Sequence, residues 1–206
     1  MKDIDRALAD ISEMRSQLAA GTMFRGLGPA VMALSGTLAG MAAICQSLWP
    51  ELLATDTITY LLTWLVMAVI AASLISAEVY ARSQRHHGGL ADAIVLNAFE
   101  QFLPAGFAGL AITIVIWKFA PQALWTLPGL WQVFLALGIF AGARSLPRAV
   151  RWIGGWYFVT GFAVLMLASS STTLSPWLMG LPFTLGQLAL GGILHFAYGE
   201  FHADEK

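Results

Sequence analysis

Six ionisable side chains could form a polar site at one edge of a membrane domain. They are Arg25, Glu78, Asp92, Glu100, Arg144 and His195. Each lies at or just inside the end of an apolar stretch, where a charge costs less than at mid-bilayer but still favours a partner or a wet cavity. We therefore predict a candidate pocket that faces the cytoplasm, in which the histidine accepts a proton or contacts a ligand and an arginine holds an anion. The alternative is that these groups reach the lipid headgroups and pair structurally.

His195 lies in the last apolar stretch, where Gln187, Gly191 and His195 are spaced four apart. This spacing predicts that all three lie on one face of a helix. A histidine that faced lipid would be costly, so we expect this face to point into the bundle. The structural alternative is a core histidine bonded to a hydroxyl or to a backbone carbonyl.

Other chemistries lack the residues that they need. Cys45 is the only cysteine, which excludes an internal disulfide and any multi-cysteine metal site within one chain. A bis-histidine haem needs two histidines at matching depth, and only His195 lies in an apolar stretch. The adjacent His86 and His87 cannot face one site from a regular helix, and we interpret them as a solvated loop. No nucleophile-elbow, zinc-protease or phosphate-loop motif is present, so we expect no enzyme, no metal and no cofactor.

The composition indicates that these residues sit on membrane helices. Hydrophobic residues make up 58% of the 206 positions and charged residues 11%, against about a quarter charged in soluble domains. Six apolar stretches are long enough to cross a bilayer. The sequence therefore predicts an all-α membrane protein with six transmembrane helices arranged as three hairpins, in a domain over 25–199. The predicted spans are 29–48, 58–77, 99–118, 130–146, 152–168 and 178–198.

The segments outside these spans are short. In 1–24, apolar residues recur at helical spacing opposite charged ones, which predicts a short cytoplasmic amphipathic helix and a turn. We expect it to pack on the protein's own cytoplasmic face, to lie on the membrane surface or to bind a partner helix. Lys118, Pro121 and 127–129 predict a loop, and 200–206 is expected to be a cytoplasmic tail. Gly36 and Gly40, four apart in the first span, predict close helix packing.

Basic residues indicate how the spans are oriented. With the N-terminus inside, ten lysines and arginines fall on the cytoplasmic side and only Lys118 falls outside. The loops are short, so this bias predicts that both termini are cytoplasmic.

Several motifs resemble those of a known group of proteins. Leu127-Pro128-Gly129-Leu130-Trp131, Gly191-Gly192-Ile193-Leu194-His195, Met14, Phe24 and the glycine turn before the first span resemble small six-span bacterial inner-membrane proteins that remain uncharacterised. The resemblance covers most of the chain and implies six spans, a bacterial inner membrane and a regulatory partner of the winged-helix class. The chain departs from the group in its acidic tail, with Glu200, Asp204 and Glu205 where a basic tail is expected. The resemblance implies no activity.

Two functions fit these features. The first is a non-enzymatic accessory, sensory or regulatory membrane protein, with a cytoplasmic protein such as a transcriptional regulator, or a second copy, as partner and no direct contact with nucleic acid. The second is a small transporter or channel for a proton or a small solute, acting as an oligomer if the pore lies between chains. The scarcity of ionisable groups at mid-bilayer speaks against the second function.

Overall fold

Six long helices make up most of the part of the chain that the structure describes, which confirms the predicted all-α fold. The computed structural model describes residues 28–86, 91–144, 146–170 and 174–203. Within these ranges, the side chains of 82–86, 91–99, 144 and 198–203 are not described. The predicted helix of 1–24 lies outside the described residues. All six helices are long and apolar enough to cross a membrane, the fourth together with the 3-10 helix that precedes it. Their bounds are α2 Pro29–Leu48, α4 Thr57–His86, α5 Ala91–Phe119, α6 Leu127–Ala141, α7 Val150–Ser169 and α8 Trp177–Ala203.

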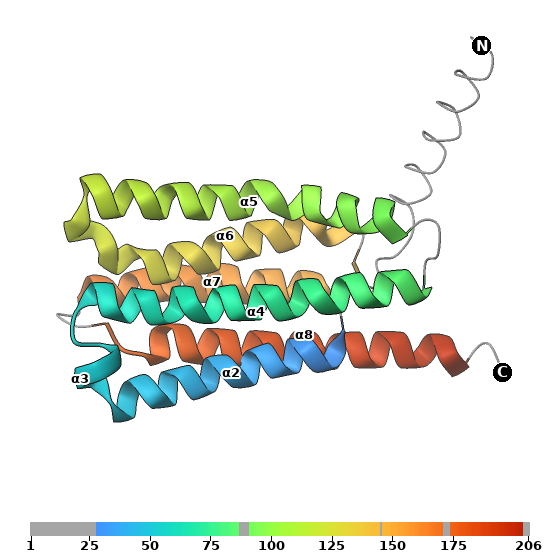
Figure 1. Cartoon of the computed structure of the whole chain (residues 1–206), viewed down its shortest axis with the longest axis horizontal. Coiled ribbons are helices and arrows are strands. Elements are labelled where there is room, and N and C mark those ends of the chain that lie inside the picture. Colours follow the sequence, from blue (N-terminus) through green and yellow to red (C-terminus); the bar gives the residue numbers. More distant parts are fainter. Residues whose placement is uncertain (1–27, 87–90, 145, 171–173, 204–206) are drawn as a thin grey trace, which may run out of the picture.

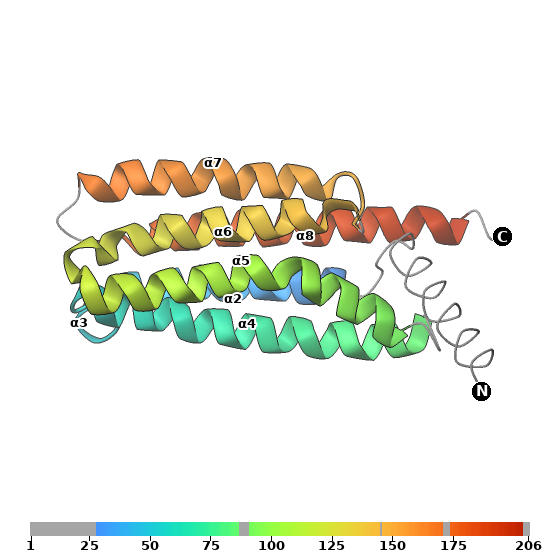
Figure 2. The same cartoon turned by 90° about the horizontal axis from the view of Figure 1, so that it is seen from above.

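The helices form a closed ring in the order α2, α4, α5, α6, α7, α8 (Figures 1 and 2). The most extensive packing joins α2 with α8, the first and last of these spans, and α6 with α7. We call the end where α2 begins and α8 ends the Pro29 end. The opposite end, which carries the short helix α3 (Pro50–Leu53), is the α3 end.

Small residues explain why the two tightest pairs approach so closely. A Cβ on Gly36 would lie 2.9 Å from the Cβ of Gln187, and one on Gly40 would lie 2.9 Å from the Oγ1 of Thr184. The close-packing prediction for these two glycines is confirmed, and the partner is α8. Between α6 and α7, a Cβ on Gly129 would lie 2.6 Å from the carbonyl oxygen of Gly161. Both interfaces therefore bring backbone or short side chains into direct contact.

The prediction of a loop around 127–129 is wrong. A 3-10 helix, η2 (Pro121–Thr126), leads directly into α6, and the candidate span is Pro121–Ala141. Proline is compatible with the first turn of a helix because its missing N–H would have no helical partner there. The predicted span 130–146 therefore begins too late, and it also ends too late, since a 3-10 turn follows at Gly142–Arg144.

Three other helices extend well beyond their predicted bounds. The second continues to His86 instead of 77, so His86 belongs to the helix and not to the predicted loop. The third begins at Ala91 instead of 99, and the sixth continues to Ala203, through part of the predicted tail 200–206. Hydropathy marks only the stretch that lipid requires, and polar helical turns can extend beyond it.

Asp56 initiates α4. The backbone N–H of Thr59 donates to the Asp56 carboxylate over 2.6 Å. This bond, with a second from the Thr59 side chain, holds the pKa of Asp56 below its ordinary value of 3.8. The charged carboxylate thus caps an exposed helix N-terminus.

The core consists of two clusters stacked along the bundle. The cluster at the α3 end includes Tyr60, Trp64 and Ile116 from α4 and α5. The cluster at the Pro29 end is built from buried residues of α2, α6, α7 and α8 alone. Consequently, no described side chain of α4 over 65–81 or of α5 over 100–115 is buried.

Candidate functional site

Five of the six predicted pocket residues belong to helices or turns at the Pro29 end. Glu78 is half-buried on α4, and Glu100 is exposed on α5. Asp92 lies in the first turn of α5 and Arg144 in the 3-10 turn after α6, but their side chains are outside the described residues, as is the whole of Arg25. A common pocket for the six therefore stays a prediction.

The prediction that His195 faces the bundle is wrong. Its side chain is exposed, with the ring edge-on to Phe196 at 5.7 Å between centroids. The preceding residue, Leu194, is fully buried, and one position along a helix is a rotation of about 100°. Gly191 is buried against the carbonyl of Pro29. The buried face of α8 is thus defined by glycine and leucine, which turns the histidine outward.

Sequence analysis missed a different polar set, inside the bundle. Gln46, Gln132 and Tyr157 are fully buried, and Trp64 is 3% exposed. Thr184 and Gln187 are half-buried, but their side-chain oxygens are inaccessible. Among the described residues, six buried side-chain atoms make no hydrogen bond of good geometry: Gln46 Oε1, Trp64 Nε1, Gln132 Oε1, Tyr157 OH, Thr184 Oγ1 and Gln187 Oε1. Two of them nevertheless have a polar neighbour, because Tyr157 interacts with the Gln187 side chain and Trp64 with that of Tyr60.

Gln132 supplies a hydrogen bond to a backbone carbonyl of α8 that a proline leaves without its helical donor. Pro182 lies inside this helix and has no N–H to donate to the carbonyl of Leu178, four residues earlier. The Gln132 Nε2 of α6 donates to that carbonyl over 3.1 Å. Because lipid offers no alternative donor, a proline in a membrane helix is tolerated when a neighbouring helix supplies one. Gln132 thereby ties α6 to the first turns of α8.

Gln46 does a similar task at the α3 end. Its Nε2 donates to the carbonyls of Leu53, at 2.9 Å, and Tyr60, at 3.3 Å. The Tyr60 hydroxyl in turn donates to the carbonyl of Ser175 over 3.2 Å, just before α8. These bonds hold the ends of α2, α3, α4 and α8 together.

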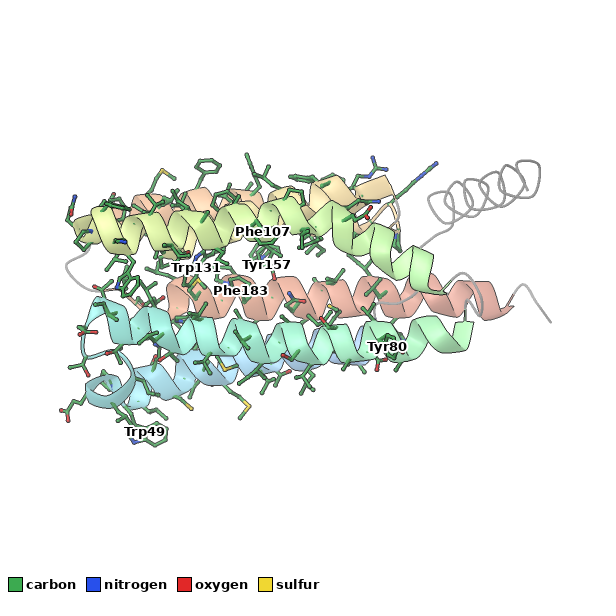
Figure 3. All side chains as sticks on the ribbon, turned by 45° about the horizontal axis from the view of Figure 1, so that its top comes forward. Trp49, Tyr80, Phe107, Trp131, Tyr157 and Phe183 are labelled. Carbon is green, nitrogen blue, oxygen red and sulfur yellow. The ribbon has the colours of Figure 1, made fainter. Side chains whose placement is uncertain are left out.

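A third polar group lies near the middle of the bundle, where α7 and α8 meet. A Cβ on Gly186 would lie 2.6 Å from the Tyr157 hydroxyl, so only glycine admits this ring. The ring lies 5.3 Å from that of Phe183, between the helices (Figure 3). The hydroxyl lies beside the Gln187 side chain. Next to this contact, the Trp156 Nε1 donates to the carbonyl of Pro182 over 2.9 Å.

These residues differ chemically from the predicted pocket. They are neutral donors and acceptors, suited to hydrogen bonding and not to holding a strong charge. Among the described residues, no three histidine, cysteine, aspartate or glutamate side chains are placed to hold a metal ion. A glutamine inside an apolar span was the available signal, because amides are costly in lipid without a partner.

No family model, no curated protein and no solved structure matches this chain.

Proposed function

We propose that this chain is a non-enzymatic accessory or regulatory membrane protein that binds a protein partner through the Pro29 end of α4 and α5. The observation that carries the proposal is the uneven packing of the ring. In the membrane-spanning windows, 17% of α4 and 6% of α5 are buried, against 33–44% of the other four spans. Helix faces with so few internal contacts can change neighbours at little cost to the fold.

The charges near these faces suit a partner at the membrane surface. Glu78 and Glu100 lie on the weakly packed segments, and Arg82 and Arg85 follow at the end of α4. Arg148 and Arg151 are exposed at the same end of the bundle, whereas Lys118 is exposed at the α3 end. From the positive-inside rule we infer that the basic end faces the cytoplasm. The resemblance described above implies that the membrane is the inner membrane of a bacterium. A cytoplasmic regulator or a second copy would therefore meet this end.

Photo-crosslinking in the native host tests the proposal. A photoreactive amino acid is placed near the Pro29 end, at Tyr80 on α4, at Phe102 on α5 or, as an exposed control on α7, at Trp152. These side chains are 62%, 37% and 80% exposed. We expect one discrete protein adduct from the α4 and α5 positions and none from the control. Co-purification of the same protein should be lost when residues 1–20 are deleted. Adducts that are equal at all three positions, or absent from all, would refute the proposal.

The buried polar atoms favour a second candidate, a small transporter or channel. Unpartnered amide and hydroxyl groups inside a membrane bundle are typical of a route for a polar solute. Flux of protons or a small solute into liposomes that carry the purified chain, reduced by Glu100→Gln or Gln187→Leu, would favour transport. Flux no greater than that of empty liposomes would exclude it.

A further inference from the structure

We propose that the turn between α6 and α7, with the first turns of α7, binds an anionic phospholipid. Arg148 and Arg151 hold the lipid phosphate, and the exposed face of α7 that follows them contacts the acyl chains. This inference is independent of the proposed function, because α7 and α4 lie on opposite sides of the bundle (Figure 2).

The two arginines lie on one side of the chain. The Arg151 N–H donates to the Arg148 carbonyl over 3.4 Å, and the Trp152 N–H donates to the Ala149 carbonyl over 3.0 Å. The turn therefore continues the helical path of α7, in which residues three and four apart are neighbours. Arg148, Arg151 and Trp152 are all exposed. Their side chains thus leave the bundle in the same direction.

Both positive charges are available to an anion. In the part of the chain that the structure describes, neither arginine forms an ion pair. The sequence also contains no acidic residue between Glu100 and Glu200, whereas Glu78 precedes Arg82 by four residues at the basic end of α4. A guanidinium can form two parallel hydrogen bonds with a phosphate. Two unpaired arginines at a membrane surface therefore attract an anionic headgroup.

The length of α7 places these arginines at the level of the lipid phosphates. The helix has 20 residues, which at about 1.5 Å per residue only just crosses a hydrocarbon core of about 30 Å. Its first turn therefore lies at the edge of that core. Trp152, in this turn, is 80% exposed, and tryptophan is typical of the headgroup level.

The surface that follows the arginines favours a lipid over a soluble anion. A Cβ on Gly155 would meet nothing within 4 Å, and Val159, one turn further, is 67% exposed. Trp156, beside the glycine, is held against α8 by its 2.9 Å bond to the Pro182 carbonyl. This apolar face lies within the candidate span Val150–Ser169. A ligand that contacts both the arginines and this face therefore carries a phosphate and hydrocarbon chains.

Native mass spectrometry of the full chain in detergent tests the proposal. Phosphatidylglycerol, which is anionic, and phosphatidylcholine with the same acyl chains, which has no net charge, are titrated separately. We expect tighter binding of phosphatidylglycerol in the wild type. In the double variant Arg148→Gln with Arg151→Gln, this binding should weaken by about fivefold per arginine, while that of phosphatidylcholine is unchanged. The matched control, Arg82→Gln with Arg85→Gln, removes the same charge from the same end and should keep the preference.

Three results would overturn the proposal. The wild type could bind both lipids equally, or the two double variants could lose the same affinity, which would show a general effect of charge. Glycerol phosphate, which carries the phosphate without acyl chains, could displace phosphatidylglycerol at an equal concentration, which would show a site for a free anion. Alkylation of Cys45 on heating shows whether each variant remains folded. If the double variant does not, Arg148→Gln alone, which lies outside α7, replaces it with an expected loss of about fivefold.

Discussion

The hydrogen bond from Gln132 to α8 should stabilise the protein because of the proline in that helix. In Gln132→Leu the carbonyl of Leu178 loses its donor inside the bundle, since Pro182 has no N–H. A buried acceptor left unsatisfied costs about 1–3 kcal/mol, whereas interhelical hydrogen bonds in membranes average about 0.6 and reach about 1.7 kcal/mol. Gln132 is fully buried and the bond is 3.1 Å long. We therefore expect a loss of about 1–2 kcal/mol.

A double-mutant cycle separates this cause from general damage to the core. Pro182→Ala restores an N–H that can bond the Leu178 carbonyl within α8, so it should recover most of the stability lost in Gln132→Leu. Gln46→Leu is the matched control: Gln46 is equally buried, but it donates to Leu53 and Tyr60, so Pro182→Ala should not rescue it.

The assay is thermal unfolding in detergent. Unfolding is detected by the alkylation of Cys45, the only cysteine. A change of 1 kcal/mol corresponds to about 2–4 °C in a domain of this size, so the expected shift is measurable. Additive effects of Gln132→Leu and Pro182→Ala, or equal rescue of Gln46→Leu, would show that the bond does not repair the proline break.

Three further outcomes are expected. Gly161→Ala should lower the melting temperature, because the new Cβ would lie 2.8 Å from the Val133 side chain and 2.9 Å from the Gly129 carbonyl oxygen. The control is Gly155→Ala on the same helix, whose Cβ would meet nothing within 4 Å. This control should leave the melting temperature unchanged or raise it. Trp131→Phe should weaken the packing of α6 on α5 by removing the 2.8 Å bond to Thr113, seen as faster proteolysis than in wild type. The lowered pKa of Asp56 means that its stabilisation is complete above its unfolded pKa and is lost as pH falls through the folded value. Melting curves below about pH 4 should therefore lose this contribution in the wild type but not in Asp56→Asn, which keeps a capping oxygen without titrating.

The existence of the six spans could be predicted because it depends only on length and apolarity. The first span is a direct case: Pro29 and Trp49-Pro50 delimit the helix at the predicted residues. The contact made by Gly36 was foreseeable in kind, since small residues mark close packing, but its partner was not.

The rotation of each helix about its axis could not be predicted. In a soluble helix a polar face reveals the buried one, whereas a membrane helix is apolar on every side. For this reason His195 was expected to face inward, although Leu194 occupies that position, and the interior amides of Gln46 and Gln132 were overlooked. The roles of these two glutamines depend on carbonyls that lie far along the chain or in another helix, which no local pattern encodes.

The pairing of α2 with α8 has a consequence for how the protein is made. The ribosome releases α2 well before α8, so the groove over Gly36 and Gly40 is filled only by lipid tails while four intervening spans are inserted. The groove is filled when α8 arrives and its threonine and glutamine enter it. A nascent chain halted before Trp177 would therefore leave α2 without its main partner.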